Sequence, residues 1–256
     1  MRPLASLLLA AGCLLGVPAL ADPTVTLCFE RQEVLPWRTL DGHGLDFELL
    51  GEAARRTGVR FEYRAMPWKR CLAQLAANEV DGAFAASFSQ ERTALGAYPG
   101  GDKADPARRL HMDRYVLVRR KGSAIDWDGH EFRHVEGRIG VQLGYSVAAF
   151  LRARQLPVDE GSQKADELAQ KLLAGRLEAA AFGGGDAVRL LRGPLGQQLE
   201  VLPEPLVEQA YYLMLSHGFA AANPKLAERI WDAIGAARAS PAHARRERSA
   251  VQSERR

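Results

Sequence analysis

Two hydroxyl groups and a guanidinium lie close together in the stretch "AASFSQER", which directly follows the apolar run "VDGAF". Ser87 and Ser89 are followed by Arg92. A serine that begins a helix accepts a hydrogen bond from a free first-turn N–H, and the positive end of the helix attracts anions. An arginine is unfavourable in that turn, but its planar donors fit a carboxylate. We therefore predict a carboxylate site where a strand passes into a helix. An ordinary helix cap beside a solvated arginine is the alternative.

Aromatic and charged side chains stand at similar positions elsewhere in the chain. Trp37 and Arg38 come after the first predicted strand, and Trp68 opens a predicted helix. Each tryptophan can stack on a ligand or pack in the core, and the sequence leaves both uses open. We expect Arg38 to add positive charge to a binding pocket, and Glu30 is a weaker candidate for the floor of that pocket.

The elements that position these residues alternate between strand and helix. In the first half, the pattern predicts strands at 24–29, 59–65 and 80–84, and helices at 44–58 and 67–79. In the second half, it predicts strands at 138–144 and 177–182, and helices at 145–155, 164–176 and 186–193. Extended segments at 109–122 and 208–218 link the halves, and a helix at 223–238 follows. This alternation is typical of parallel sheets covered by helices.

We therefore predict an α/β protein of the periplasmic-binding-protein-like type, with two lobes joined by two extended hinge crossovers. The predicted boundaries are 22–112 for the first lobe, 113–210 for the second, and 211–240 for the return to the first lobe. Ligands of such sheets bind at the carboxyl ends of the strands, here in a cleft between the lobes. We expect hinges near 115–118 and 211–215, about which the lobes close on a ligand.

The beginning of the chain has the pattern of a secretory signal. A short positive start is followed by an apolar run that ends at Ala19-Leu20-Ala21. We predict a signal peptide at 1–21, cleavage after Ala21, and export to a bacterial periplasm. Cys13 follows small residues, which leaves a lipoprotein as the alternative.

Two cysteines remain after this predicted cleavage, Cys28 and Cys71. An even number of cysteines in an oxidising compartment favours a disulfide, with two buried free thiols as the alternative. Cys28 lies in a predicted strand and Cys71 on the apolar face of a predicted helix, so a bridge is geometrically reasonable.

Composition excludes several classes of function. The net charge is only +3, with acidic and basic residues mixed along the chain, so we expect no nucleic-acid surface. The segment 241–256 is charged and poor in large apolar residues, and we predict a flexible basic tail, with a lipid-binding patch as the alternative. The six histidines are scattered and no nucleophile motif is present. We therefore predict no metal, no cofactor and no catalytic residue.

Three stretches resemble the bacterial extracellular solute-binding proteins of family 3, which serve amino-acid ABC transporters. They are the first-lobe segment from "LPWR" to "VDGAF", the element "SFSQER" and the element "RIGVQLGYS". The resemblance implies that Arg92 holds a ligand carboxylate, supported by Ser87 and Ser89. The family has threonines where Tyr145 and Ser146 stand, so Ser146 is expected to donate a hydrogen bond and Tyr145 to add a ring. Many relatives carry an acidic residue in place of Arg38.

One departure from the family pattern bears on the ligand. In the family, a second-lobe aspartate that pairs with the ligand's ammonium group stands where this chain has Gly183. Asp186 lies three residues further along, in a predicted helix, and we expect its carboxylate not to reach the same point. An unpaired buried ammonium is costly, so the sequence predicts poor binding of ordinary α-amino acids and favours an organic or aromatic acid.

The resemblance implies a monomeric binding protein, not an enzyme, that presents a small carboxylate-bearing ligand to an ABC permease. Two alternatives remain open. Related domains serve as sensors for membrane signalling partners, and cyclohexadienyl dehydratases resemble solute-binding proteins in fold. A dehydratase needs a general acid, for which the sequence offers Glu30 or Asp186 without selecting either.

Overall fold

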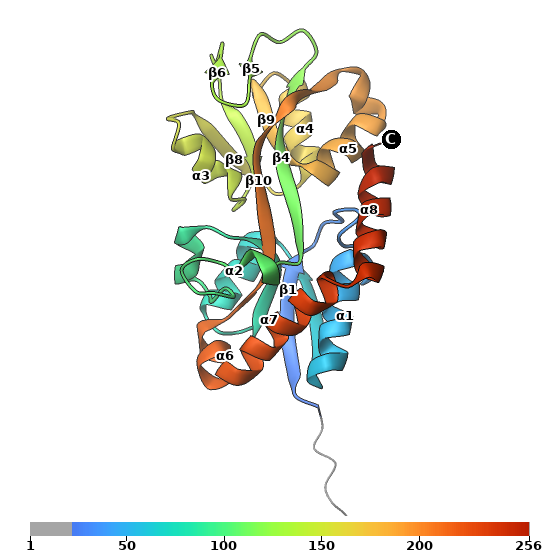
Figure 1. Cartoon of the computed structure of the whole chain (residues 1–256). Coiled ribbons are helices and arrows are strands. Elements are labelled where there is room, and N and C mark those ends of the chain that lie inside the picture. Colours follow the sequence, from blue (N-terminus) through green and yellow to red (C-terminus); the bar gives the residue numbers. More distant parts are fainter. Residues whose placement is uncertain (1–21, 256) are drawn as a thin grey trace, which may run out of the picture.

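The structure is a computed structural model, and it describes residues 22–255. The predicted signal peptide at 1–21, with Cys13, lies outside these residues, as does Arg256. Figure 1 shows two lobes, one above the other, joined by two long strands, with one helix running along the side of both. The predicted α/β architecture with two extended crossovers is confirmed.

The first lobe is built on three parallel strands, β1 (Thr24–Glu30), β2 (Arg60–Met66) and β3 (Gly82–Ser87). Helix α1 (Leu45–Thr57) begins after Gly44 and ends at Gly58, which has the left-handed conformation that glycine adopts without steric cost. Helix α2 (Trp68–Ala76) begins after Pro67, where a missing N–H costs nothing. Phe29, Phe47 and Phe84 belong to the core on the α1 side of the sheet.

The second lobe repeats this arrangement. Its parallel strands are β7 (Ile139–Gln142), β8 (Val158–Ser162) and β9 (Ala179–Gly183). The helices are α3 (Val147–Arg152), α4 (Ala165–Leu173) and α5 (Gly184–Arg192). Two short strands, β5 (Asp126–Trp127) and β6 (Phe132–Arg133), form a separate pair. The sequence did not predict β8, because its segment "VDEGS" is acidic and carries a single apolar side chain.

Two long antiparallel strands, β4 (His111–Arg120) and β10 (Leu199–Leu215), connect the lobes. They complete one eight-stranded sheet with the order β2-β1-β3-β10-β4-β9-β7-β8. β4 pairs with β9 only from Tyr115 onwards, and β10 pairs with β3 only from Tyr211 onwards. Between these points, 112–114 and 208–210 pair with each other alone among the described strands. The crossover is therefore a two-stranded ribbon, a few residues away from the predicted hinges.

Cys28 and Cys71 form the predicted disulfide, which is confirmed. Their Cα atoms lie 5.7 Å apart, within the usual range for a bridge. Both residues are fully buried, and the bond ties β1 to α2. It thereby fixes the start of the helix that carries Trp68.

The C-terminal segment contains α6 (His217–Ala222), α7 (Pro224–Arg238) and α8 (Pro241–Arg255). The predicted flexible tail is wrong, because 241–255 is helical. Ala250 and Val251 pack against an apolar cluster in the first lobe, and Arg246 forms an ion pair of 2.8 Å with Glu48 of α1. In Figure 1, α8 runs from the first lobe towards α5 of the second. The helix was not predicted from the sequence, because its apolar contact surface is small.

Short 3-10 helices complete the chain at η1 (Gln90–Ala94), η2 (Pro106–Arg108) and η3 (Pro194–Gln197). Within residues 22–255, no helix combines the length and the apolar character that a membrane span requires.

Candidate functional site

A small cavity of about 40 Å³ lies between the lobes, where the strands of both end. Its lining comes from both lobes and from the crossover: Glu30, Val34, Arg38, Trp68, Ala85, Ser87, Arg92, His111, Asp113, Tyr115, Tyr145, Gly183, Asp186 and Tyr211. We call it the inner pocket. A volume of this size holds only about three water molecules, whereas sites for small molecules span about 300 Å³ or more. The lobes must therefore separate to admit a ligand.

Arg92 places a buried guanidinium in the inner pocket, where several contacts hold it. It lies in η1, immediately after β3, and only 7% of its surface is exposed. Its Nη1 donates to the Ser87 carbonyl oxygen at 3.0 Å and to Ser87 Oγ at 2.6 Å. Its Cζ lies 5.6 Å from the ring centre of Trp68, a cation–π distance. The guanidinium is thus oriented by the end of the strand and by an aromatic wall.

The second lobe meets Arg92 and Ser87 directly. Nη2 of Arg92 donates to the Gly144 carbonyl oxygen at 2.9 Å. Ser87 Oγ donates to Ser146 Oγ at 2.9 Å, and Ser146 Oγ also accepts from Gln209 of β10. These hydrogen bonds join residues of the two lobes across the cleft. The structure is therefore a closed arrangement in which a second-lobe carbonyl occupies the position that a ligand anion would need.

Three carboxylates line the inner pocket together with this cation. Glu30 accepts from the Trp68 backbone N–H at 2.8 Å, Asp186 forms an ion pair of 3.5 Å with Arg189, and Asp113 accepts from the backbone N–H of Arg114. Burial raises the pKa of Asp186 to about 6, against the opposing effect of Arg189. Burial also raises the pKa of Glu30 and of Asp113. A cationic partner would stabilise the ionised form of each of these carboxylates.

Arg38 supplies a second guanidinium to the same pocket. It is 7% exposed, and its Nε is buried without a hydrogen-bond partner. Its charge lowers the pKa of Glu30, Asp113 and Asp186, although burial outweighs this effect at each carboxyl. A buried donor without a partner is costly, so Arg38 is available to a ligand acceptor.

An aromatic stack that was not predicted from the sequence contributes His111 and Tyr211 to another wall of the inner pocket. His111 lies between Trp37, at 4.2 Å between ring centres, and Tyr211, at 4.9 Å, with nearly parallel planes. His111 Nδ1 is 2.7 Å from Asp46 Oδ1, and both residues are buried. The stack joins the first lobe to both crossover strands at their register pair His111–Tyr211.

A period-two pattern could have revealed part of this wall. His111, Asp113 and Tyr115 alternate along β4, and alternate residues of a strand share one face. All three line the inner pocket. The segment was predicted only as an extended crossover, so these three residues were not among the predicted site residues.

Most of the predicted site residues meet in the inner pocket. Seven of them line it together with Asp186: Glu30, Arg38, Trp68, Ser87, Arg92, Tyr145 and Gly183. Ser146 lies beside it through its hydrogen bond to Ser87. Ser89 and Trp37 do not line it. Ser89 stands at the start of η1 but its side chain makes no cap hydrogen bond, so its predicted capping role is wrong.

The structure bears on the interpretation of two charged residues. The alternative that Arg92 is a solvated helix arginine is wrong, because Arg92 is buried and hydrogen-bonded. Asp186 was expected not to reach the point at which the family's aspartate stands, the position of Gly183, and both residues line the inner pocket. Helix α5 begins at Gly184, so Asp186 lies in its first turn, close to the end of β9. The predicted poor binding of ordinary α-amino acids stays a prediction.

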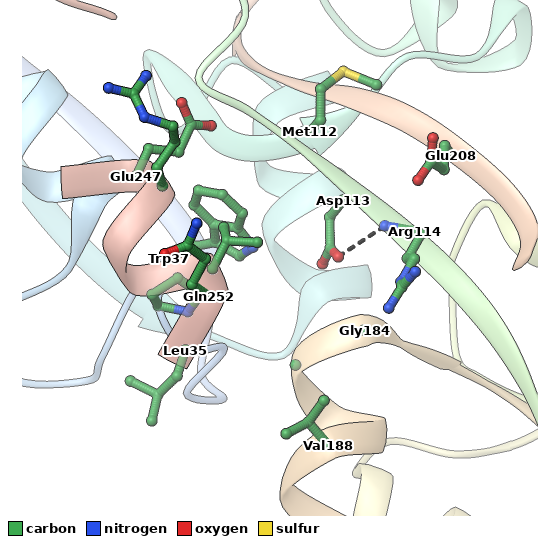
Figure 2. Close-up of a pocket in the computed structure, with 14 residues that line it drawn as sticks. Leu35, Trp37, Met112, Asp113, Arg114, Gly184, Val188, Glu208, Glu247 and Gln252 are labelled. Carbon is green, nitrogen blue, oxygen red and sulfur yellow. Dashed lines mark hydrogen bonds between the residues drawn. The ribbon is translucent and has the colours of Figure 1, made fainter. Parts of the chain in front are cut away.

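The two tryptophans have different roles. Trp68 is 6% exposed, and it both lines the inner pocket and packs in the core around the disulfide. Trp37 is 5% exposed and packs with Val34, Leu45 and the residues of α8. It lines a second, larger cavity of about 430 Å³ on the α8 side of the cleft. We call this the outer cavity (Figure 2).

A third hollow, of about 400 Å³, adjoins the inner pocket on another side. It shares Glu30 and Trp68 with the inner pocket, and four exposed basic residues surround it: Arg31, Lys69, Arg70 and Lys164. None of the four takes part in an ion pair with any described residue. This basic mouth would attract anions from solution.

The fold and the site together define a two-lobed ligand-binding protein whose cleft lies at strand ends. The chain belongs to the bacterial extracellular solute-binding proteins, family 3, whose family model matches residues 36–249.

Solved structures of low sequence identity share the fold. An ancestral arginine-binding protein bound to glutamine has a TM-score of 0.67 at 18% identity, covering 89% of this chain and 97% of its own. The GluR0 ligand-binding core from Nostoc punctiforme, in complex with L-glutamate, has a TM-score of 0.62 at 14% identity, covering 90% and 96%. A histidine kinase sensor domain with similarity to periplasmic binding proteins has a TM-score of 0.70 at 16% identity, covering 90% and 97%. Among curated proteins, no sequence matches this chain.

Proposed function

We propose that this protein is a periplasmic binding protein that closes around a small carboxylate-bearing ligand and presents it to a membrane partner. The main support for this proposal is a set of contacts across the cleft: Arg92 and Ser87 of one lobe lie at hydrogen-bond distance from Gly144 and Ser146 of the other. A ligand carboxylate can replace the Gly144 carbonyl on the Arg92 guanidinium when the lobes open. Closure then buries a charge-assisted hydrogen bond, which is stronger than a neutral one.

The charges of the inner pocket favour an amino-acid-like ligand. Two arginines and three carboxylates line it, which gives a formal charge of −1 when all are ionised. A ligand with one carboxylate and one ammonium group satisfies both kinds of side chain. The carboxylate would bind Arg92 and Arg38, and the ammonium would face Asp186. An organic acid without an ammonium group would add a negative charge beside the buried carboxylates and offer them no cationic partner.

We propose that the membrane partner is an ABC permease and that the protein acts as a monomer in the periplasm after cleavage of the predicted signal peptide. Sensing is the second candidate. The histidine kinase sensor domain of similar fold supports it, because the same closure can be read by a signalling partner. The absence of a nucleophile motif from the sequence favours binding over catalysis, so we propose no enzymatic activity.

The proposal is tested with the mature, ligand-stripped protein and a panel of the twenty common amino acids and small organic acids. A ligand at about 100 times its dissociation constant should add about 2.7 kcal/mol to the free energy of unfolding, measured by thermal shift. The best ligand is then titrated by calorimetry. A panel without any stabilising member would contradict the proposal.

Arg92→Gln should weaken binding of that ligand at least a hundredfold, because the desolvated carboxylate loses its charged partner. The matched control is Arg176→Gln, since Arg176 is exposed and lies outside the inner pocket. Equal affinity of the Arg92→Gln variant and the control would refute the assigned role. Because Arg92 is buried, its variant must first be shown to be folded by circular dichroism.

A further inference from the structure

The outer cavity is distinct from the inner pocket but adjoins it. Asp113 lines both cavities, and the turn after β9 contributes Gly183 to the inner pocket and Gly184 and Gly185 to the outer one. We propose that the outer cavity is a second small-molecule site, which takes an apolar molecule ending in an ammonium group. This site goes beyond the proposed function, because nothing in the carboxylate site requires it.

The walls of the outer cavity are apolar. They are formed by Leu35, Pro36, Trp37, Met112, Val188 and Val251. Leu35 is 48% exposed and Met112 is 42% exposed, which is unusual for such large apolar side chains beside a concave surface. Removing this surface from water stabilises a bound apolar group by about 25 cal/mol for each Å² buried. A volume of about 430 Å³ is within the range of small-molecule sites.

The floor of the cavity carries a negative charge. Figure 2 shows the Asp113 carboxylate projecting into the gap between Trp37 and Gly184. One of its oxygens accepts from the backbone N–H of Arg114 at 2.7 Å. A carboxylate beside an aromatic ring is a favourable environment for an ammonium group.

The charges at the rim cancel one another. The negative charges of Glu208 and Glu247 balance the positive charges of Arg114 and Arg248. The carboxylate on the floor therefore determines which charge the preferred ligand carries. Burial raises the pKa of the Asp113 carboxyl, and the charges of His111 and Arg38 oppose this rise. A bound ammonium group would favour the ionised carboxylate in the same direction.

Two glycines at the start of α5 let its backbone approach the cavity floor closely. A Cβ on Gly184 would lie 2.9 Å from Asp113 Oδ1, and a Cβ on Gly185 would lie 2.6 Å from the Leu35 carbonyl oxygen. Glycine is therefore needed at both positions for this close approach. It lets α5 and the first lobe enclose the cavity together.

Helix α8 closes the outer side. It contributes Glu247, Arg248, Val251 and Gln252 to the lining. A molecule bound here contacts the first lobe at Leu35, the crossover ribbon at Met112 and the second lobe at Val188. Because it bridges both lobes, it would favour the closed arrangement, and each of the two sites would then strengthen binding at the other.

The test uses the full mature protein and n-hexylamine, which is protonated at neutral pH, with 1-hexanol and hexanoate as matched probes. Calorimetry should show the tightest binding for hexylamine, weaker binding for hexanol and the weakest for hexanoate. Affinity should rise about fourfold for each methylene added between butylamine and hexylamine. Hexanoate binding as tightly as hexylamine, or no binding of hexylamine, would overturn the proposal.

Two variants locate the probe. Val188→Lys places a like charge in the wall and should weaken hexylamine binding at least tenfold, while the control Leu40→Lys, at another exposed apolar residue, should not. Asp113→Asn should remove the preference for hexylamine over hexanol while hexanol still binds. Hexylamine binding that survives Val188→Lys unchanged would place the probe elsewhere and sink the inference.

The outcome is separable from that of the proposed function. Arg92 does not line the outer cavity, so Arg92→Gln should leave hexylamine binding intact. Binding of the carboxylate ligand should be lost in Arg92→Gln alone, and binding of hexylamine should be lost in Val188→Lys alone.

Discussion

Asp186 shows how one residue can change the expected ligand. Its spacing from Gly183 suggested a carboxylate within a helix that does not reach the point at which the family's aspartate stands. In the structure it is 4% exposed and lines the inner pocket. A helix that begins one residue earlier or later rotates each side chain by about 100°, and sequence patterns do not fix helix starts that closely. The residue type was predictable, but its direction was not.

The raised pKa of Asp186 predicts a specific pH dependence of stability. Burial raises the folded-state pKa of Asp186 to about 6, above its ordinary value of 3.8. The folded state therefore binds this proton more tightly, and stability falls as the pH rises from about 4 to about 6. Asp186→Asn should raise the free energy of unfolding at pH 7.5 by about 3 kcal/mol and change it little at pH 4.

Urea denaturation of the ligand-free protein at the two pH values measures this difference. Asp102→Asn, at an exposed aspartate, is the control and should have no effect at either pH. If Asp186→Asn lowers stability at pH 7.5, the ion pair with Arg189 outweighs the burial of the carboxylate, and the prediction is wrong.

At the scale of elements, the strands and helices with strong apolar periodicity were predictable. The strand–helix alternation of both lobes and the two crossovers follow from the sequence, because core-facing side chains recur at fixed spacing. The strand β8 and the helix α8 were not predictable, since each is stabilised by a neighbour and has little apolar surface of its own. The antiparallel direction of β4 and β10 also depends on tertiary pairing.

The disulfide between β1 and α2 should contribute strongly to stability. The bond joins residues separated by 43 positions, and the chain-entropy model gives about 4 kcal/mol for a loop of this length. Reduction should lower the free energy of unfolding by about that amount in urea denaturation. The Cys28→Ala/Cys71→Ala double variant should be insensitive to the reductant. Equal stability of oxidised and reduced wild-type protein would contradict this expectation.

At the scale of the whole molecule, the closed arrangement depends on hydrogen bonds that cross the cleft. Gln32 makes two of them outside the inner pocket. Its Nε2 donates to the Gln163 carbonyl oxygen at 3.0 Å, and its Oε1 accepts from the Ala165 backbone N–H at 3.2 Å. Gln32 therefore offers a way to disturb closure without touching the proposed ligand contacts.

Gln32→Ala should shift the ligand-free protein towards an open form. The variant loses two hydrogen bonds, each about 1 kcal/mol, which destabilises the closed state. Because the ligand is bound in the closed state, its affinity should fall roughly tenfold. Small-angle X-ray scattering should show a larger radius of gyration without ligand and the wild-type value with saturating ligand. Gln197→Ala, at an exposed glutamine of η3, is the control. An unchanged radius and affinity would show that Gln32 does not stabilise closure.

The route of the chain through the two lobes has a consequence for its biosynthesis. The first lobe needs residues from both ends of the chain, because β10 completes its sheet beside β3 and α7 packs against α1. The second lobe is continuous and lies between these parts. During translation or export, which deliver the N-terminus first, the first lobe cannot acquire its core until nearly the entire chain has emerged. The early segment therefore lacks its completed core for most of this time, a state that suits the export that we propose for this protein.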